Sequence, residues 1–291
     1  MASVTARAKA AAKSSGQQPD LLLRQFEFSR LLARVFATES AEHWVLKGGI
    51  AQLARIPGGR MTRDIDLFHR TRQADLDQAV SEFEAAMAID LGDHFAFRVV
   101  EVQEIPEKSG RVGAAGRGLV VGVRSAKSSQ NIPIDIVVDS VMTGTPDVAR
   151  YESVPIPGIE PPTVRLYPLV DHMADKIAAT HTLFGSTRRS TRVRDMADLV
   201  LFATRQSVDG AALHRAIAAE WSYREFEGGP QFDPPEEWRP AYATMVRDLD
   251  VIIHKTFDTA RNLLARFLDP ALAGEVDGFT WNPSTLTWEQ Q

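Results

Sequence analysis

Two aspartates separated by one residue, Asp64 and Asp66, are the strongest chemical signal in the chain. They belong to the run Thr62 to Phe68, whose alternation of apolar and polar residues predicts a strand. In a strand, residues i and i+2 stand on one face about 6.5–7 Å apart. Two carboxylates at that separation can share one or two hard cations, and without a counterion their like charges repel. The pattern favours a metal site, with surface acids on an edge strand as the ordinary alternative.

Asp135 is the only charged residue in the apolar run Ile132 to Val138, which also predicts a strand. Burying an unpaired carboxylate costs several kcal/mol, so this side chain needs a partner. A metal ion shared with Asp64 and Asp66 would supply one, and an arginine would do so equally well. We favour the shared metal because the aspartate pair also lacks a counterion.

A third signal is the turn Lys47-Gly48-Gly49, between a predicted strand at His43 to Leu46 and a predicted helix at Ile50 to Ile56. Two glycines let the backbone approach an anion closely, and a helix N-terminus presents free N–H groups with a partial positive charge. A glycine pair is more often only a tight turn. Because an Asp-x-Asp sequence begins 15 residues after the second glycine, we expect this turn to bind phosphate.

Together these motifs resemble a known family. The runs Val45-Leu46-Lys47-Gly48-Gly49 and Thr62-Arg63-Asp64-Ile65-Asp66-Leu67 look like the minimal nucleotidyltransferases of the polymerase-β superfamily, and most closely the AbiEii (MenT-type) toxins of bacterial toxin–antitoxin pairs. That family adds an acid on a later strand, a lysine on a helix and a further acidic helix motif. The resemblance spans residues 44 to 204. It implies that the acid on the later strand is Asp135, that the helix lysine is Lys176, and that the acidic helix motif is the run Arg194-Asp195-Met196-Ala197-Asp198-Leu199.

The resemblance implies a metal-dependent transferase that moves an NMP from an NTP to an RNA acceptor, with the tRNA 3′ end as the expected site. It also implies the role of a toxin with a cognate antitoxin protein as partner, and Mg²⁺ or Mn²⁺ as cofactor. The implied catalytic residues are Asp64, Asp66, Asp135, Lys176 and Asp195, of which the first three are the metal ligands. The implied nucleotide-binding residues are Lys47, Gly48, Gly49, Thr62 and Lys176.

One position departs from the family pattern. Many relatives have Ser or Thr after the two glycines, where a hydroxyl can bond a phosphate oxygen, and this chain has Ile50. Two alternatives therefore stay open. One is a transferase of the same fold that acts on a small-molecule or protein hydroxyl. The other is a non-catalytic partner-binding module whose acidic trio is structural or holds a metal without turnover.

Four arginines lie within seven residues: Arg188, Arg189, Arg192 and Arg194. The net charge of −5 provides no global positive field, so binding of nucleic acid would need such a local patch. Charge clusters usually form solvated surfaces, but arginines beside a nucleotide site would bind the phosphates of an RNA acceptor. We expect Asp198 to pair with Arg194 at i+4, which leaves Asp195 as the functional acid.

Composition sets limits on the other chemistries. The hydrophobic share of 44% and charged share of 24% are ordinary globular values, which exclude a mainly disordered protein. Absence of cysteine excludes disulfides and thiolate metal sites, and it fits a cytoplasmic location. No apolar run reaches the ~20 residues that span a bilayer, so no membrane association is expected. The seven histidines show no metal-binding spacing, and we interpret each as an ordinary surface residue.

The remaining elements define the expected organisation. We expect a flexible basic tail over residues 1–18, a mixed α/β (α+β) domain over 19–160 with a small mixed sheet and helices on one side, and a helical domain over 161–291 that closes a cleft. The fold implied by the resemblance is the polymerase-β-like nucleotidyltransferase domain. Further strands are predicted at 95–102 and 119–123, and helices at 20–40, 75–87, 169–183, 192–206, 210–220 and 240–268.

Overall fold

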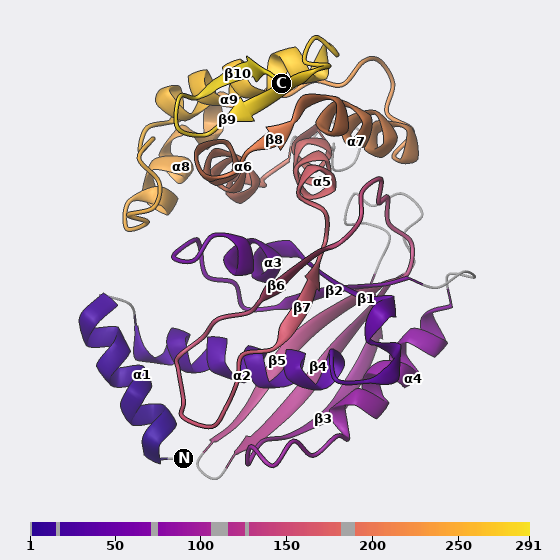
Figure 1. Ribbon diagram of the computed structural model, residues 1–291, viewed down its shortest axis with the longest axis vertical. Helices are drawn as coiled ribbons and strands as arrows, with labels where there is room; N and C mark the ends of the chain where they lie inside the picture. Colours follow the sequence, from indigo (N-terminus) through magenta and orange to yellow (C-terminus); the bar gives the residue numbers. More distant parts are fainter. Residues whose placement is uncertain (1, 16–17, 71–74, 106–115, 126–127, 182–189) are drawn as a thin grey trace.

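A computed structural model describes residues 2–15, 18–70, 75–105, 116–125, 128–181 and 190–291. It confirms the expected mixed α/β class, with a seven-stranded sheet in the first part and mainly helices in the second (Figure 1). The strand order is β3-β4-β5-β2-β1-β7-β6. The bounds of the strands are β1 (Trp44–Lys47), β2 (Ile65–His69), β3 (Ala96–Glu104), β4 (Gly116–Ser125), β5 (Ser128–Val137), β6 (Asp147–Arg150) and β7 (Thr163–Leu166).

The centre of the sheet combines parallel and antiparallel pairs. Strand β2 runs parallel to β5 and antiparallel to β1, and β1 runs parallel to β7. The outer neighbours β3 and β4, β4 and β5, and β6 and β7 pair antiparallel. Because β2 lies between β1 and β5, the side chains of three strands can meet on its outer face.

Helices cover one face of this sheet and form its core. They are α2 (Pro19–Val35) and α4 (Leu76–Met87), while α3 (Gly48–Arg55) follows β1 directly. Helix α4 begins where the side chain of Asp75 accepts a hydrogen bond from the backbone N–H of Gln78, an N-cap that satisfies a free donor of the first turn. The core joins Phe28 of α2, Phe83 of α4 and Ile50 of α3 with the inward residues of β2 and β5.

The N-terminal segment is a helix, and not the flexible tail expected for residues 1–18. Helix α1 (Ala2–Ser15) buries Val4, Ala8 and Ala12, which recur every fourth residue and therefore form one stripe. Ala8 and Ala12 pack against Leu22 of α2 and against Val154. This apolar stripe was not recognised in the sequence because two of its three residues are alanines, whose side chains are small.

The second part contains five helices and a small sheet among the described residues. The helices are α5 (Leu169–His181), α6 (Val193–Arg205), α7 (Gly210–Tyr223), α8 (Arg239–Val246) and α9 (Phe257–Leu272). The small sheet has the order β10-β9-β8, with bounds β8 (Val208–Asp209), β9 (Phe279–Asn282) and β10 (Thr287–Gln290). A separate apolar core includes Phe202, Phe267 and Trp281, all fully buried. None of the helices in the described ranges has the length and apolar character needed to traverse a bilayer.

Two expectations for this second part are wrong in detail. The single helix expected over residues 240–268 is divided into α8 and α9, because the Lys255 ammonium donates to the carbonyls of Val246 and Leu249 while the Thr256 side chain caps α9. The sheet also extends past the expected boundary at residue 160, since β7 belongs to it. Strands β7 and β8, of four and two residues, were not recognised because so few residues show little alternation.

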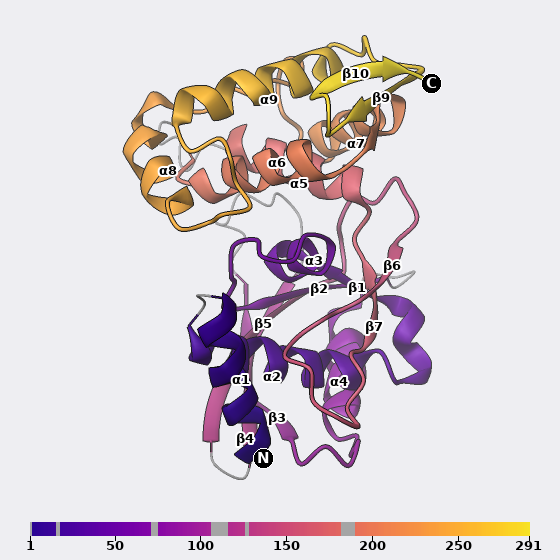
Figure 2. The ribbon, with the colours of Figure 1, turned by 60° about the vertical axis from the view of Figure 1, so that its left-hand side comes forward.

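The two parts contact each other around α3. Figure 2 shows α3 between the sheet and the helices of the second part. Ile56, directly after α3, is buried in the core of the second part, and the Arg55 guanidinium donates to the carbonyl of Tyr167 at 2.6 Å. The segment that contains the glycine turn therefore lies where the two parts meet.

Candidate active site

Three charged side chains form a row across the centre of the sheet. The register places Asp66 of β2 opposite Asp135 of β5 and opposite Lys47 of β1. Ile65 and Leu67 are fully buried in the core below, so Asp66 stands on the other face. Neighbouring strands lie about 4.7–4.9 Å apart, which brings both carboxylates and the lysine onto one small patch. We call Lys47, Asp66 and Asp135 the charged row.

Asp64, two residues before Asp66, lies outside the strand. Strand β2 begins at Ile65, three residues later than expected, and Asp64 occupies a bend just before it. The Thr62 hydroxyl donates a hydrogen bond to Oδ1 of Asp64. Thr62, an expected nucleotide contact, is thus a buried partner that orients the first aspartate.

Close packing leaves no room for a side chain at the two glycines after Lys47, since Gly48 packs against Asp66 and Gly49 against Thr62. Gly48 has φ +61°, and a Cβ added there would lie 1.7 Å from Oδ2 of Asp66. A Cβ added to Gly49 would lie 2.9 Å from the Cβ of Thr62. Helix α3 starts at Gly48, so its first N–H groups have no intrahelical partners. The turn therefore brings backbone N–H groups without intrahelical partners next to Asp66, in the arrangement typical of anion sites.

Substitution of Gly48 tests this packing. We expect Gly92→Ala, at φ +65° with no atom within 4 Å of the new Cβ, to lose about 1–2 kcal/mol of unfolding free energy from backbone strain alone. Gly48→Ala should lose more, because the same strain is joined by collision with the Asp66 carboxylate. Denaturant unfolding of the two variants measures the difference. Equal losses would show that Asp66 does not occupy this place.

Lys47 is buried at the end of β1 and faces the second part of the chain. Its ammonium donates to Oγ of Ser140 and lies 4.1 Å from the ring centre of Tyr167, a cation–π contact. A small pocket opens beside it. Residues of both parts line this pocket: Lys47, Val137, Asp139, Ser140, Asp175, Glu220, Tyr223 and Arg224. The pocket therefore lies where residues of the two parts of the chain meet.

The walls of this pocket from the helical part are held by an ion-pair network. The Arg224 guanidinium donates to Asp175 and to Glu220, each at 2.7 Å. Burial, together with the nearby charge of Asp175, raises the pKa of Glu220. The ion pairs of Arg224 with Asp175 on α5 and with Glu220 on α7 therefore hold these two helices together next to Lys47.

Lys176 of α5 is buried in a second network. Its ammonium donates to Asp195 at 3.1 Å and to Asp198 at 2.7 Å, both on α6. Burial opposes the charged form of Lys176, but the two carboxylates outweigh it and raise the pKa. Asp198 is fully buried and does not pair with Arg194 as the spacing suggested; it accepts from Lys176 and from Arg60.

Arg60, four residues before Asp64, joins the first part of the chain to this network. Its guanidinium donates to Asp198 at 3.1 Å. Burial opposes its charge, yet the carboxylates of Asp198 and, more weakly, Asp64 raise its pKa. Sequence reasoning missed Arg60, although a cation four residues before Asp64 was a usable signal for a counterion. Arg60 thus links the carboxylate bend to the helical part.

Of the four arginines expected to bind RNA, the structure describes two. Arg194 is exposed on α6. Arg192 is half-buried just before α6 and lies 3.6 Å from Asp195. Arg188 and Arg189 lie outside the described residues. The two visible arginines therefore stand at the same helix end as Asp195.

The chain matches one protein-family model and resembles solved structures. A family model described as "Nucleotidyl transferase AbiEii toxin, Type IV TA system" matches residues 30–263. Among solved structures, JHP933 from Helicobacter pylori is 14% identical over 91% of each chain, with a TM-score of 0.44. A putative nucleotidyltransferase from H. pylori is 13% identical over 87% of this chain and 95% of its own, with a TM-score of 0.45. No curated protein matches.

Proposed function

The chain belongs to the AbiEii nucleotidyltransferase toxin family of type IV toxin–antitoxin systems, and from this we propose that it transfers an NMP from an NTP to an RNA acceptor. The expected acceptor site is the 3′ end of tRNA, and a cognate antitoxin is the expected protein partner. The observation that carries the proposal is the register that sets Asp66 directly opposite Asp135, with Asp64 two residues before Asp66 in the chain.

The carboxylates fit a divalent cation. Their oxygens are the ligands that Mg²⁺ and Mn²⁺ prefer, and α3 starts so close that Gly48 has no room for a side chain. We assign Asp64, Asp66 and Asp135 as the ligands. Bound there, the metal would supply charge neutralisation for the triphosphate and for the attacking and leaving oxygens.

The residues of the chain then have separate tasks. The backbone N–H groups of Gly48 and Gly49 bind phosphate oxygens at the start of α3. The side chain of Ile50 cannot bond a phosphate oxygen, because it is buried in the core and carries no hydroxyl. Lys47 adds positive charge from the adjacent strand. Lys176 has three N–H donors, of which two bind Asp195 and Asp198, so one is left for a phosphate oxygen.

The reaction is an in-line displacement at the α-phosphorus. Asp135 accepts the proton of the acceptor hydroxyl, whose oxygen forms the new bond to phosphorus. The bond from the α-phosphorus to the bridging oxygen breaks, and pyrophosphate leaves with that electron pair. Asp195 keeps Lys176 charged and in place, since its carboxylate accepts from the ammonium.

Labelling tests the proposed reaction. The purified protein is incubated with Mg²⁺, total bacterial RNA and each of the four α-³²P-labelled NTPs in turn. Label that enters a tRNA-sized band and is absent with Asp66→Asn supports the proposal. Label on protein or on a small molecule instead would favour the same-fold alternative. If nothing is labelled, the non-catalytic binding module becomes the better interpretation.

Reversal of the visible arginines tests the RNA surface. We expect Arg192→Glu/Arg194→Glu to weaken transfer to RNA. The slope of the logarithm of RNA affinity against the logarithm of salt concentration should become shallower by roughly 1.4–1.8, since each lost phosphate contact removes about 0.7–0.9. The matched control is Arg98→Glu/Arg124→Glu, which reverses two exposed arginines on β3 and β4 with the same change in net charge. Identical slopes in the two double variants would contradict an RNA contact at α6.

A further inference from the structure

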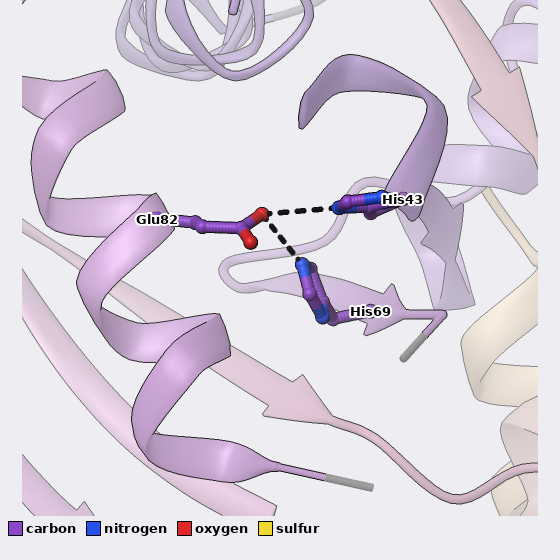
Figure 3. Close-up of side chains that lie close together, drawn as sticks. All are labelled: His43, His69 and Glu82. Atoms are coloured by element: carbon purple, nitrogen blue, oxygen red, sulfur yellow. Dashed lines mark hydrogen bonds and ion pairs between the residues drawn. The ribbon is translucent and has the colours of Figure 1, made fainter. Parts of the chain in front are cut away.

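Two histidines and one glutamate from three separate elements converge at the other end of the β1–β2 pair. His43 ends the short helix η1 (Glu39–His43), His69 ends β2, and Glu82 lies on α4. Figure 3 shows both imidazoles pointing at the same carboxylate oxygen. Oε2 of Glu82 lies 3.3 Å from Nδ1 of His43 and 2.8 Å from Nε2 of His69. The three ligand atoms all lie within 4.8 Å of one another.

These separations suit a tetrahedral ion. Zinc binds imidazole nitrogen at about 2.0–2.1 Å and carboxylate oxygen at about 2.0–2.2 Å, which places two ligand atoms about 3.3–3.4 Å apart. The contact between His43 and Glu82 already has that length, and the contact between His69 and Glu82 needs to open by about half an ångström. The two histidine nitrogens, which lie within 4.8 Å of each other, need to come to the same separation. We propose that His43, His69 and Glu82 bind a transition-metal ion, with Zn²⁺ as the preferred ion and a water molecule as fourth ligand.

The surroundings hold the ligands in place. The side chain of Gln78 donates to the other oxygen of Glu82 at 2.8 Å, which leaves Oε2 to face the histidines. His69 is fully buried, and the Trp44 ring packs at 4.5 Å from its ring centre. Nδ1 of His69 has no hydrogen-bond partner among the described residues, so packing and Glu82 alone orient the imidazole ring. The His43 side chain is 38% exposed, so an ion and its water can enter from that side.

This site is separate from the charged row. His69 shares a strand face with Ile65 and Leu67, whereas Asp66 stands on the opposite face. Trp44 pairs with His69 and Lys47 with Asp66, so the two sites are three residues apart along the strands, about 10 Å. Two imidazoles with one carboxylate also select a different ion from three carboxylates. A bound ion would fasten α4 to the strands that carry Lys47 and Asp66.

Cobalt binding tests the proposal. The full-length protein is stripped with EDTA, freed of chelator and titrated with Co²⁺, whose visible absorption strengthens on tetrahedral ligation. We expect one tetrahedrally bound equivalent per chain by this absorption, displaced by one equivalent of Zn²⁺. Glu82→Gln and His43→Gln should each weaken binding by more than about 100-fold, because loss of even an outer-shell partner costs about 10–100-fold. Zn²⁺ should raise the Tm of the parent protein and leave that of Glu82→Gln unchanged.

Two controls locate the ion. His94→Asn alters an exposed histidine on another loop and should bind cobalt like the parent protein. Asp64→Asn/Asp66→Asn removes carboxylates of the other site and should also leave cobalt binding intact. Circular dichroism of the stripped variants confirms that they are folded. Binding that persists in both Glu82→Gln and His43→Gln, that is lost in Asp64→Asn/Asp66→Asn, or that never reaches one equivalent overturns the proposal.

Discussion

Replacement of Asp66 by Asn is expected to lower nucleotidyl transfer by at least about 10³-fold while the protein stays folded. The substitution keeps the size of the side chain, so the contact with Gly48 survives, but it removes the charge at the centre of the charged row. Stabilisation of transition-state charge by a bound metal is worth several kcal/mol, and each 1.36 kcal/mol is about tenfold in rate. Initial rates of label incorporation at saturating NTP measure the loss.

The control for this variant is Asp77→Asn, which neutralises a carboxylate on α4 that is 94% exposed. It should retain the activity of the parent protein. Thermal unfolding of both variants separates loss of chemistry from loss of fold. If Asp66→Asn keeps activity within about tenfold of the control, the charged row does not hold the reacting phosphate and the binding-module alternative gains support.

Replacement of Lys176 by Met is expected to have the largest effect on stability, about 3–5 kcal/mol of unfolding free energy. The ammonium is buried between Asp195 and Asp198, and removing one partner of a buried ion pair leaves uncompensated charge. Arg60 still binds Asp198 at 3.1 Å, whereas Asp195 keeps only the more exposed Arg192 at 3.6 Å, so Asp195 bears most of the penalty. Denaturant unfolding at neutral pH measures the loss.

A double variant and a kinetic readout separate the two roles of Lys176. Lys176→Met/Asp195→Asn removes the charge left behind and should recover part of the stability. If Lys176 also contacts the triphosphate, the double variant will show a KM for NTP that is raised beyond any change caused by Asp195→Asn alone. An unchanged KM would confine Lys176 to holding α5 against α6. Failure of the double variant to recover stability would contradict the pairing itself.

The sequence determined the local elements that carry the site. Alternation around Asp64 and Asp66 predicted the strand β2, and the isolated charge in the run around Asp135 predicted a second strand with an acid in need of a partner. These predictions depend on short-range sterics and on which face of an element is apolar, and both are written in neighbouring residues. The start of β2 differed by three residues because element ends depend on long-range packing.

Which distant groups meet depends on how the elements pack. The parallel register of β2 and β5 places Asp66 opposite Asp135. Because α5 packs on α6, Asp198 forms ion pairs with Lys176 and Arg60 rather than with Arg194. His43, His69 and Glu82 are 26 and 13 residues apart, a spacing that carries no metal signal in the sequence. They converge because α4 packs on β3, β4 and β5 to bury its apolar face, and its Phe83 ring contacts the Trp44 ring of β1. Such contacts result from the burial of whole surfaces, so no local pattern encodes them.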